Sequence, residues 1–306
     1  MRRHYKLYSS GFQEWDQKTH AETYLLFPEN IGQNLSIDEV ALSQGELYTF
    51  LTNKSGKGKH KTIVAVIQGT RSDDIKTVLE KMPLHKRQQV REITMDMAKN
   101  MESSVRDMFP NSRLVIDRFH VVKLVSEALQ QIRIKLRWQA IEDENIAIKK
   151  AKENKKKYVP LVLKNGDSPK QLLARTRYAL GKNPDDWTNS QKKRIAILFN
   201  LFPTIKEAYK HTLHLKSIYK HNHTPSYAKV LFEQWIQKTN DNKLEDFYSA
   251  SNSISYHLDN IVNFFHQRHT NANAESFNAK IKLFRANLRG VVDNDFFLFR
   301  ISKLFA

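Results

Sequence analysis

The sequence SIDEVALSQGELYTFLTNKSGKGKHKTIVAVIQG, residues 36–69, contains three strand-like segments separated by short polar loops. Residues 36–43 read as a strand, whose side chains would alternate between two faces: Ile37, Glu39 and Ala41 on one, Asp38, Val40 and Leu42 on the other. Residues 47–52 and 62–69 are rich in the β-branched and aromatic residues that favour strands. Three strands joined by short loops predict an antiparallel meander.

Beyond residue 70 the pattern changes to an alternation of helix and strand. Ser72 or Asp73 can cap a helix that runs to about Met82, where Pro83 ends it. Further segments follow as strand, helix, strand and helix, at residues 91–97, 97–109, 113–117 and from 121 onward. The order βββαβαβα predicts parallel strands with right-handed crossovers. It is the order of ribonuclease-H-like (RNase H-like) domains, in which the first strand lies beside the fourth.

Three aspartates occupy related places in this frame. Asp38 lies on the first strand, Asp96 at the carboxyl end of the fourth, and Asp117 ends the fifth. Open α/β sheets bind ligands beyond the carboxyl ends of their strands, so we expect these acids at one edge of the sheet. Glu39 neighbours Asp38 but points to the opposite face, which favours a pairing or surface role.

Net charge indicates a polyanionic partner. The 306 residues carry a formal charge of +18. Residues 121–270 hold 26 Lys and Arg against 14 Asp and Glu, a net charge of +12. Such a surplus favours binding to nucleic acid. Part of this positive charge lies in a cluster of six lysines: Lys149, Lys150, Lys152, Lys155, Lys156 and Lys157. The cluster forms either a solvated face or a contact with the DNA backbone.

Several classes of protein are excluded by composition. The chain has no cysteine, which rules out disulfides, thiol nucleophiles and Cys-ligated zinc modules. No apolar run approaches the roughly 18 residues that span a bilayer, and the first residues contain no signal-peptide core. The expected location is the cytosol.

Helical periods dominate from residue 121 to about 265, where strand signals are scarce. We interpret this segment as an all-α insertion, with helices in residues 191–220 interrupted at Pro203. The predicted organisation is a lead-in at 1–32, a catalytic domain at 33–120, the insertion at 121–265 and the rest of the catalytic domain at 266–306. Three tryptophans on helical positions are expected in the core, with base stacking as the alternative: Trp138, Trp187 and Trp235.

The last segment, TNANAESFNAKIKLFRANLRG at residues 270–290, predicts an amphipathic helix. Its apolar stripe includes Phe277 and Ile281. Glu275 lies beside the stripe in the first turn, and Asn278 and Lys282 follow three and seven residues later on the same face. The helix could pack against the sheet and deliver a fourth carboxylate.

Carboxylates at one sheet edge suggest metal chemistry. Two divalent ions about 3.5–4 Å apart can activate an attacking oxygen and stabilise the leaving oxygen of a phosphodiester. Mg²⁺ prefers hard oxygen ligands, and Mn²⁺ accepts the same set. Asp38, Asp96 and Glu275 meet that need. Asp117 stays open as an alternative second acid.

Four segments resemble the DDE transposases of bacterial insertion sequences, close to the ISL-three group. SIDEVAL resembles the strand of the first acid, ITMDMAKNM the segment of the second acid, and VIDRFHVVKL the signature that follows. TNANAESFNAKIKLFRANLRG resembles the glutamate helix of that family. The resemblance is densest over residues 36–137 and 264–306.

This resemblance implies roles for individual residues. Asp38, Asp96 and Glu275 would be the catalytic triad and hold two Mg²⁺ or Mn²⁺ ions. Lys282 matches a basic position that such enzymes use near the DNA end. Asp117 and His120 match an Asp-x-x-His element after the second acid, and the residues alone leave His120 equally open to a structural role.

The resemblance also implies partners. They are the terminal inverted repeats of the element, target DNA, and a second copy of the chain in a homodimer or larger synaptic complex. Family members commonly carry a zinc ribbon and a helix-turn-helix ahead of the catalytic strand. Here Cys is absent and about 32 residues precede that strand, so end recognition is expected in the insertion or in a separate helix-turn-helix protein, or it is lost in a truncated copy. The resemblance also implies a location in the bacterial cytoplasm, in association with the nucleoid.

The predicted function is DNA transposition by metal-dependent cleavage at the element ends and 3′-hydroxyl strand transfer. Two rivals share some of its features. A nuclease or resolvase would use the same acids without strand transfer, and a non-catalytic DNA-binding remnant would need none of them.

Overall fold

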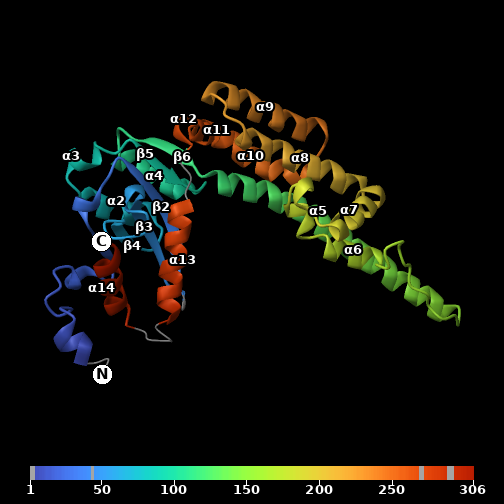
Figure 1. Cartoon of the computed structure of the whole chain (residues 1–306), viewed down its shortest axis with the longest axis horizontal. Helices are drawn as coiled ribbons and strands as arrows, with labels where there is room; N and C mark the ends of the chain where they lie inside the picture. Colours follow the sequence, from blue (N-terminus) through green and yellow to red (C-terminus); the bar gives the residue numbers. More distant parts are fainter. Residues whose placement is uncertain (1–3, 43–44, 269–271, 288–292) are drawn as a thin grey trace. The chain divides into compact units, whose positions relative to one another are not determined.

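The computed structural model describes residues 4–42, 45–268, 272–287 and 293–306, without the side chains of residues 272 and 273. The chain divides into two compact units. Unit 1 comprises residues 1–118 and 259–306, and unit 2 comprises residues 119–258 (Figure 1). Thr270, Asn271 and Gly290, at the two ends of the predicted glutamate helix, lie outside the described residues.

A six-stranded mixed sheet forms the centre of unit 1, in the order β1-β4-β3-β2-β5-β6. β2 is antiparallel to β3, and β3 to β4, while β2, β5 and β6 run parallel. The predicted meander and the pairing of the first strand with the fourth are therefore confirmed. The bounds are β1 Tyr24–Leu26, β2 Asn34–Ala41, β3 Leu47–Asn53, β4 Ile63–Gln68, β5 Glu92–Met95 and β6 Arg113–Ile116.

The edge strand β1 was not predicted. It is antiparallel to β4 and has only three residues, too few for a period to show in the sequence. Its neighbours Phe12 and Trp15 are buried in the same apolar cluster as Leu25. Thus residues ahead of β2 contribute to the core of unit 1.

Helices cover both faces of the sheet. α2 (Ser72–Glu80) and α4 (Lys99–Met108) pack against each other, and they contact β4 and β5 respectively. α13 (Ala272–Asn287) and α14 (Asn294–Phe305) bury apolar side chains with Val40 and Phe50 in the main apolar cluster. The expected packing of the glutamate helix on the sheet is confirmed. Short helices complete unit 1: α3 Leu84–Arg87, α11 Leu258–Val262 and α12 Phe264–Gln267.

The start of α2 differs from the sequence prediction, in which Ser72 or Asp73 caps the helix. Its N-cap residue is Arg71, which makes no side-chain capping bond, so neither Ser72 nor Asp73 caps the helix. Asp73 instead lies in the first turn, where a carboxylate stabilises the helix through its dipole.

Unit 2, residues 119–258, consists of helices joined by loops, and the structure describes all of these residues. The long helix α5 (Arg118–Glu153) contributes most of its length to this unit. The other helices are α6 Pro169–Arg175, α7 Asn189–Leu201, α8 Pro203–Lys220, α9 Pro225–Asp241 and α10 Tyr248–Tyr256. The break at Pro203 falls where the sequence predicts it, because proline is accepted in the first turn of a helix but not in its interior.

The three tryptophans differ in their environment. Trp235 is fully buried, and Trp187 is half-buried and stacks on Tyr209. Trp138 is 64% exposed, so its assignment to the core was wrong. Helical spacing alone did not reveal that this stretch of α5 lacks a covering helix.

His211 stabilises the core of unit 2 as a neutral ring. It stacks on Trp235, and its Nε2 lies 2.7 Å from Thr239 Oγ1. Because Thr239 Oγ1 donates to the Trp235 carbonyl, His211 Nε2 is the donor to Thr239. Burial, with smaller contributions from His214 and Lys238, lowers the pKa of His211 to about 4.

This pKa predicts acid sensitivity. The folded pKa lies below the ordinary value of 6.5, so the unfolded chain binds more protons between pH 6.5 and 4, and stability falls as pH falls through that window. We expect the free energy of unfolding to fall by up to about 3 kcal/mol. In His211→Phe most of this pH-dependent loss should disappear. The measurement is the free energy of urea unfolding at pH 7.5 and at pH 4.5. His221→Gln, at an exposed position, is the matched control. An equal loss in the His211 variant would contradict the assignment.

Candidate active site

Asp38 lies in the middle of the central strand β2 and faces helix α13. Its register partner on β3 is Phe50, whose ring packs edge-on against Phe277 of α13 at 6.2 Å. The carboxylate is half-buried. Its Oδ2 accepts a hydrogen bond of 2.6 Å from Asn278 Nδ2, and its Oδ1 accepts one of 2.9 Å from the Glu39 backbone N–H. A direct contact therefore joins β2 to α13.

Glu275 lies in the first turn of α13, three residues before Asn278. Ala274, Phe277 and Ile281 point into the core, while Glu275 is exposed. Residues three apart share a helix face, so the turn that carries Glu275 is the turn next to Asp38. The helix lies where the sequence predicts it, and Asn278 is on the side of the helix that contacts Asp38.

Two further contacts fix α13 in place. Lys280 Nζ donates to the Gly58 carbonyl at 3.2 Å, in the loop between β3 and β4. Arg285 is 3% exposed; its Nε donates to Glu46 Oε2 at 3.0 Å and its Nη2 to Asn294 Oδ1 at 2.6 Å. The middle and the C-terminal end of the helix are therefore tied to other segments of unit 1.

Asp96 follows the last residue of β5. Ser36 of β2 pairs with Thr94 of β5, so Asp38 and Asp96 are each two residues beyond that pair in parallel neighbouring strands. Asp96 Oδ1 accepts a 2.8 Å hydrogen bond from the backbone N–H of Ala98, the N-cap residue of α4. The side chain is half-buried at the junction of strand and helix.

Glu39 is coupled electrostatically to Asp96. Burial is the main cause that raises the pKa of Glu39; the charge of Asp96 raises it further, while a hydrogen bond from Asn100 lowers it. The expected pairing role therefore fits, with Asn100 as the partner. The coupling to Asp96 was not predicted. The alternation of side chains along β2 shows which face Glu39 is on, but it does not show where Asp96, beyond the end of β5, places its charge.

Asp117 follows β6 and is 2% exposed. Its backbone N–H donates to the Met95 carbonyl at 2.9 Å, which continues the pairing of β5 with β6. All three aspartates therefore lie on the three parallel strands or directly after them.

A buried lysine occupies the same face of the sheet. Lys54 Nζ lies 3.3 Å from Glu92 Oε1 and also donates to Thr94 Oγ1. Glu92 and Thr94 are paired with Asn34 and Ser36, and so share the face of Asp38. Burial lowers the pKa of Lys54, against the opposing charges of Glu92 and Asp117. Sequence reasoning missed this residue; a charged Glu92 at the head of an otherwise apolar strand was the available signal.

The remaining predicted residues lie at the surface or near it. Lys282 is exposed on α13. His120 is half-buried in the first turn of α5, where its ring contacts Phe119 at 5.5 Å. The six lysines at 149–157 are exposed, at the end of α5 and just after it.

The donor set suits a hard cation, although the carboxylates do not form a ready-made cage. Within the described ranges, no three His, Cys, Asp or Glu side chains lie close enough together to hold a metal ion. The Asp38 carboxylate, which accepts hydrogen bonds from Asn278 and from the Glu39 backbone N–H, is a hard oxygen donor of the kind that hard cations bind. Oxygen ligands alone favour Mg²⁺ or Mn²⁺.

The sheet order and its acids define an RNase H-like α/β domain interrupted by a helical unit. A family model described as a transposase, that of the ISL3 group of DDE enzymes, matches residues 35–301. The chain therefore belongs to this transposase family. No curated protein and no solved structure matches it. Among the described residues, no helix is both long and apolar enough to cross a membrane.

Proposed function

We propose that this transposase cuts DNA at the ends of its element and joins the freed 3′-hydroxyl to target DNA, with Asp38, Asp96 and Glu275 as the metal-binding triad. The single observation that carries the assignment is the 2.6 Å hydrogen bond from Asn278 to Asp38. It joins residues 240 positions apart and sets the Glu275 turn beside the first acid. A chance surface glutamate would have no reason to share a turn with a hydrogen-bond donor to Asp38.

Each residue then has a defined task. Two Mg²⁺ or Mn²⁺ ions held by the triad would supply an activated oxygen nucleophile and charge stabilisation for the leaving oxygen. Asn278 holds the Asp38 carboxylate in one orientation. Asp117 supports the site from its place directly after β6, and exposed Lys282 faces the DNA end.

The sharpest test of the function compares two reactions on one substrate. DNA that bears the element ends is incubated with the protein and Mg²⁺, with any separate helix-turn-helix partner supplied. Transposition gives both nicked ends and joined products. A nuclease or resolvase gives nicks alone, and a DNA-binding remnant gives neither.

We propose further that five of the six lysines at residues 149–157, all except Lys150, bind DNA phosphates. Replacing Lys149, Lys152, Lys155, Lys156 and Lys157 with glutamine should weaken binding to DNA of any sequence. For every phosphate that is no longer neutralised, the slope of log K against log salt should also become shallower by about 0.9. The measurement is a salt titration of DNA affinity. A control with five glutamines at exposed lysines elsewhere, Lys57, Lys59, Lys61, Lys81 and Lys99, tests for a general charge effect. An unchanged slope in the first variant would show that the cluster is only solvated.

A further inference from the structure

The C-terminal half of α5, which we call its far half, forms one wall of an open apolar groove in unit 2. The groove has a volume of about 320 Å³. The opposite wall is the chain that follows α5, in which Val159 is 80% and Leu161 66% exposed. Leu136, Ala140 and Ala147 line the helix side. Large apolar side chains left open to water in a contiguous groove mark a binding surface.

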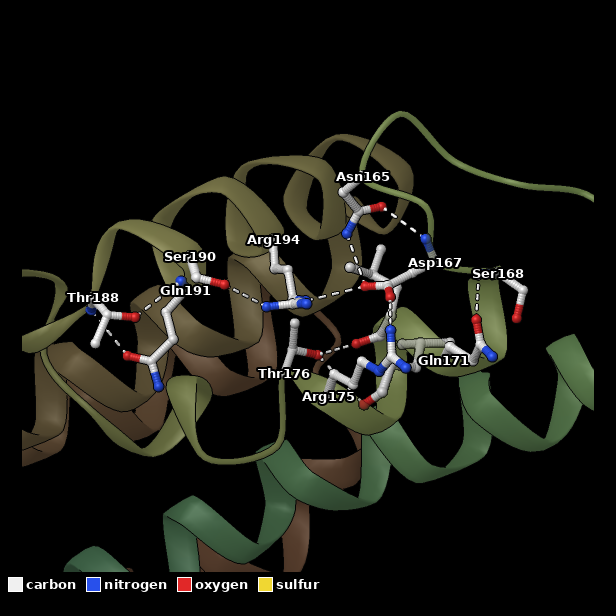
Figure 2. Close-up of polar contacts among 12 residues, drawn as sticks. Asn165, Asp167, Ser168, Gln171, Arg175, Thr176, Thr188, Ser190, Gln191 and Arg194 are labelled. Carbon is white, nitrogen blue, oxygen red and sulfur yellow. Dashed lines mark hydrogen bonds and ion pairs between the residues drawn. The ribbon is translucent and has the colours of Figure 1, made fainter.

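The groove is rigidly built. Tyr158 donates to Glu144 of α5 at 3.4 Å, and Lys170 forms an ion pair with the same carboxylate. Figure 2 shows how Asp167, 1% exposed, holds the end of the returning chain. It accepts hydrogen bonds from Asn165 and Arg194, at 2.8 and 3.1 Å, and one from Arg175. The exposed wall therefore keeps its place without a partner.

Charge at the mouth of the groove argues against nucleic acid as its occupant. Asp143 and Glu144 line the groove, and Glu142 is exposed beside them. A phosphate backbone would be repelled by these carboxylates. The fitting occupant is a helix that is apolar at its centre and basic at one end.

The same stretch of α5 has that pattern. Asp143, Ile146, Ala147 and Lys150 follow at steps of three, one and three residues, so they lie on one helix face. Two copies packed antiparallel about a point between Ile146 and Ala147 would set Asp143 of each opposite Lys150 of the other. Acids at 142–144, apolar residues at 146–148 and lysines at 149–152 thus make the surface complementary to itself, as a two-fold interface requires.

We propose that two copies of this chain associate through this groove, with the far halves of their α5 helices antiparallel. The proposal assigns Lys150 to the protein partner and leaves the neighbouring lysines to DNA. It supplies a surface for the dimer expected of the proposed function, but its test does not depend on DNA cleavage.

Charge reversal tests the pairing. By analytical ultracentrifugation without DNA, the wild type should form a dimer. Asp143→Lys and Lys150→Asp should each raise the dissociation constant by at least about tenfold, because each places like charges face to face twice. The double variant should recover dimerisation. These side chains are exposed, and circular dichroism checks that each variant is folded. A monomeric wild type, or a dimer indifferent to both single changes, would overturn the proposal.

Crosslinking tests the register. The chain has no cysteine, so Ala147→Cys introduces a single thiol next to the two-fold axis. Mild oxidation should give a covalent dimer, and Glu233→Cys, exposed on α9, should give much less. Equal crosslinking at both positions would contradict the interface. A groove that instead binds DNA would show itself if Asp143→Lys strengthened DNA affinity and left the oligomeric state unchanged.

Discussion

Asp96→Asn is expected to lower Mg²⁺-dependent nicking by about a thousandfold or more, which corresponds to about 4 kcal/mol of activation free energy. The substitution keeps the size of the side chain, and the amide oxygen can still accept the hydrogen bond from Ala98. It removes the negative charge that a hard divalent cation requires. Folding should therefore hold while cleavage fails. The measurement is a nicking assay on DNA bearing the element ends, with DNA binding followed by gel shift.

Asp117→Asn is the matched control for this experiment. If Asp117 only supports the metal ligands, Asp117→Asn should lower the nicking rate by about 10–100-fold, and Asp96→Asn should lower it much more. The reverse order would make Asp117 the second acid. DNA binding should persist in both variants, because the proposed DNA contacts are lysines of unit 2. If nicking survives both changes, the metal mechanism proposed for these acids is wrong.

Lys54→Met is expected to reduce the free energy of unfolding by about 3–5 kcal/mol. Its ammonium group forms an ion pair with Glu92, whose side chain is only 5% exposed. Without it, a buried carboxylate on the central sheet loses this ion pair, and Thr94 no longer receives its hydrogen bond from Lys54. Urea denaturation followed by circular dichroism measures the change.

The double variant Lys54→Met/Glu92→Met separates charge from packing. Replacing a whole buried ion pair with apolar side chains is often neutral, so much of the stability should return. Lys57→Met, at an exposed position in the same loop, should change stability by less than about 0.5 kcal/mol. A double variant as unstable as the single one would show that Lys54 stabilises the fold through interactions other than the ion pair.

Local periodicity was enough to predict most of the sheet. The strands around Asp38 and Asp96 alternate or run apolar over several residues, and their order along the chain left few possible pairings. β1 escaped because three residues carry no period, and its place is set by burial beside β4. Trp138 was misplaced for a related reason: a helix pattern shows which residues share a face, but not whether another element covers that face.

The candidate site was predictable where one residue type marks it. Asp38, Asp96 and Glu275 stand out in the sequence as carboxylates on a strand, at a strand end and beside an apolar stripe. The Lys54–Glu92 pair joins a loop to a strand 38 residues away, and such a pairing depends on tertiary packing that no local pattern contains. The coupling of Glu39 to Asp96 was missed for the same reason.

The central claim is that Asp38, Asp96 and Glu275 hold metal ions together, and Fe²⁺ cleavage of the protein tests it most directly. Fe²⁺ takes the place of Mg²⁺ and, with ascorbate and peroxide, generates hydroxyl radicals that cut the backbone near the bound metal. The proposed triad predicts cuts near residues 38, 96 and 275, three segments far apart in the sequence, and their suppression by excess Mg²⁺ and by Asp38→Asn. Cuts confined to residues 96 and 117, with the chain intact near 275, would contradict it.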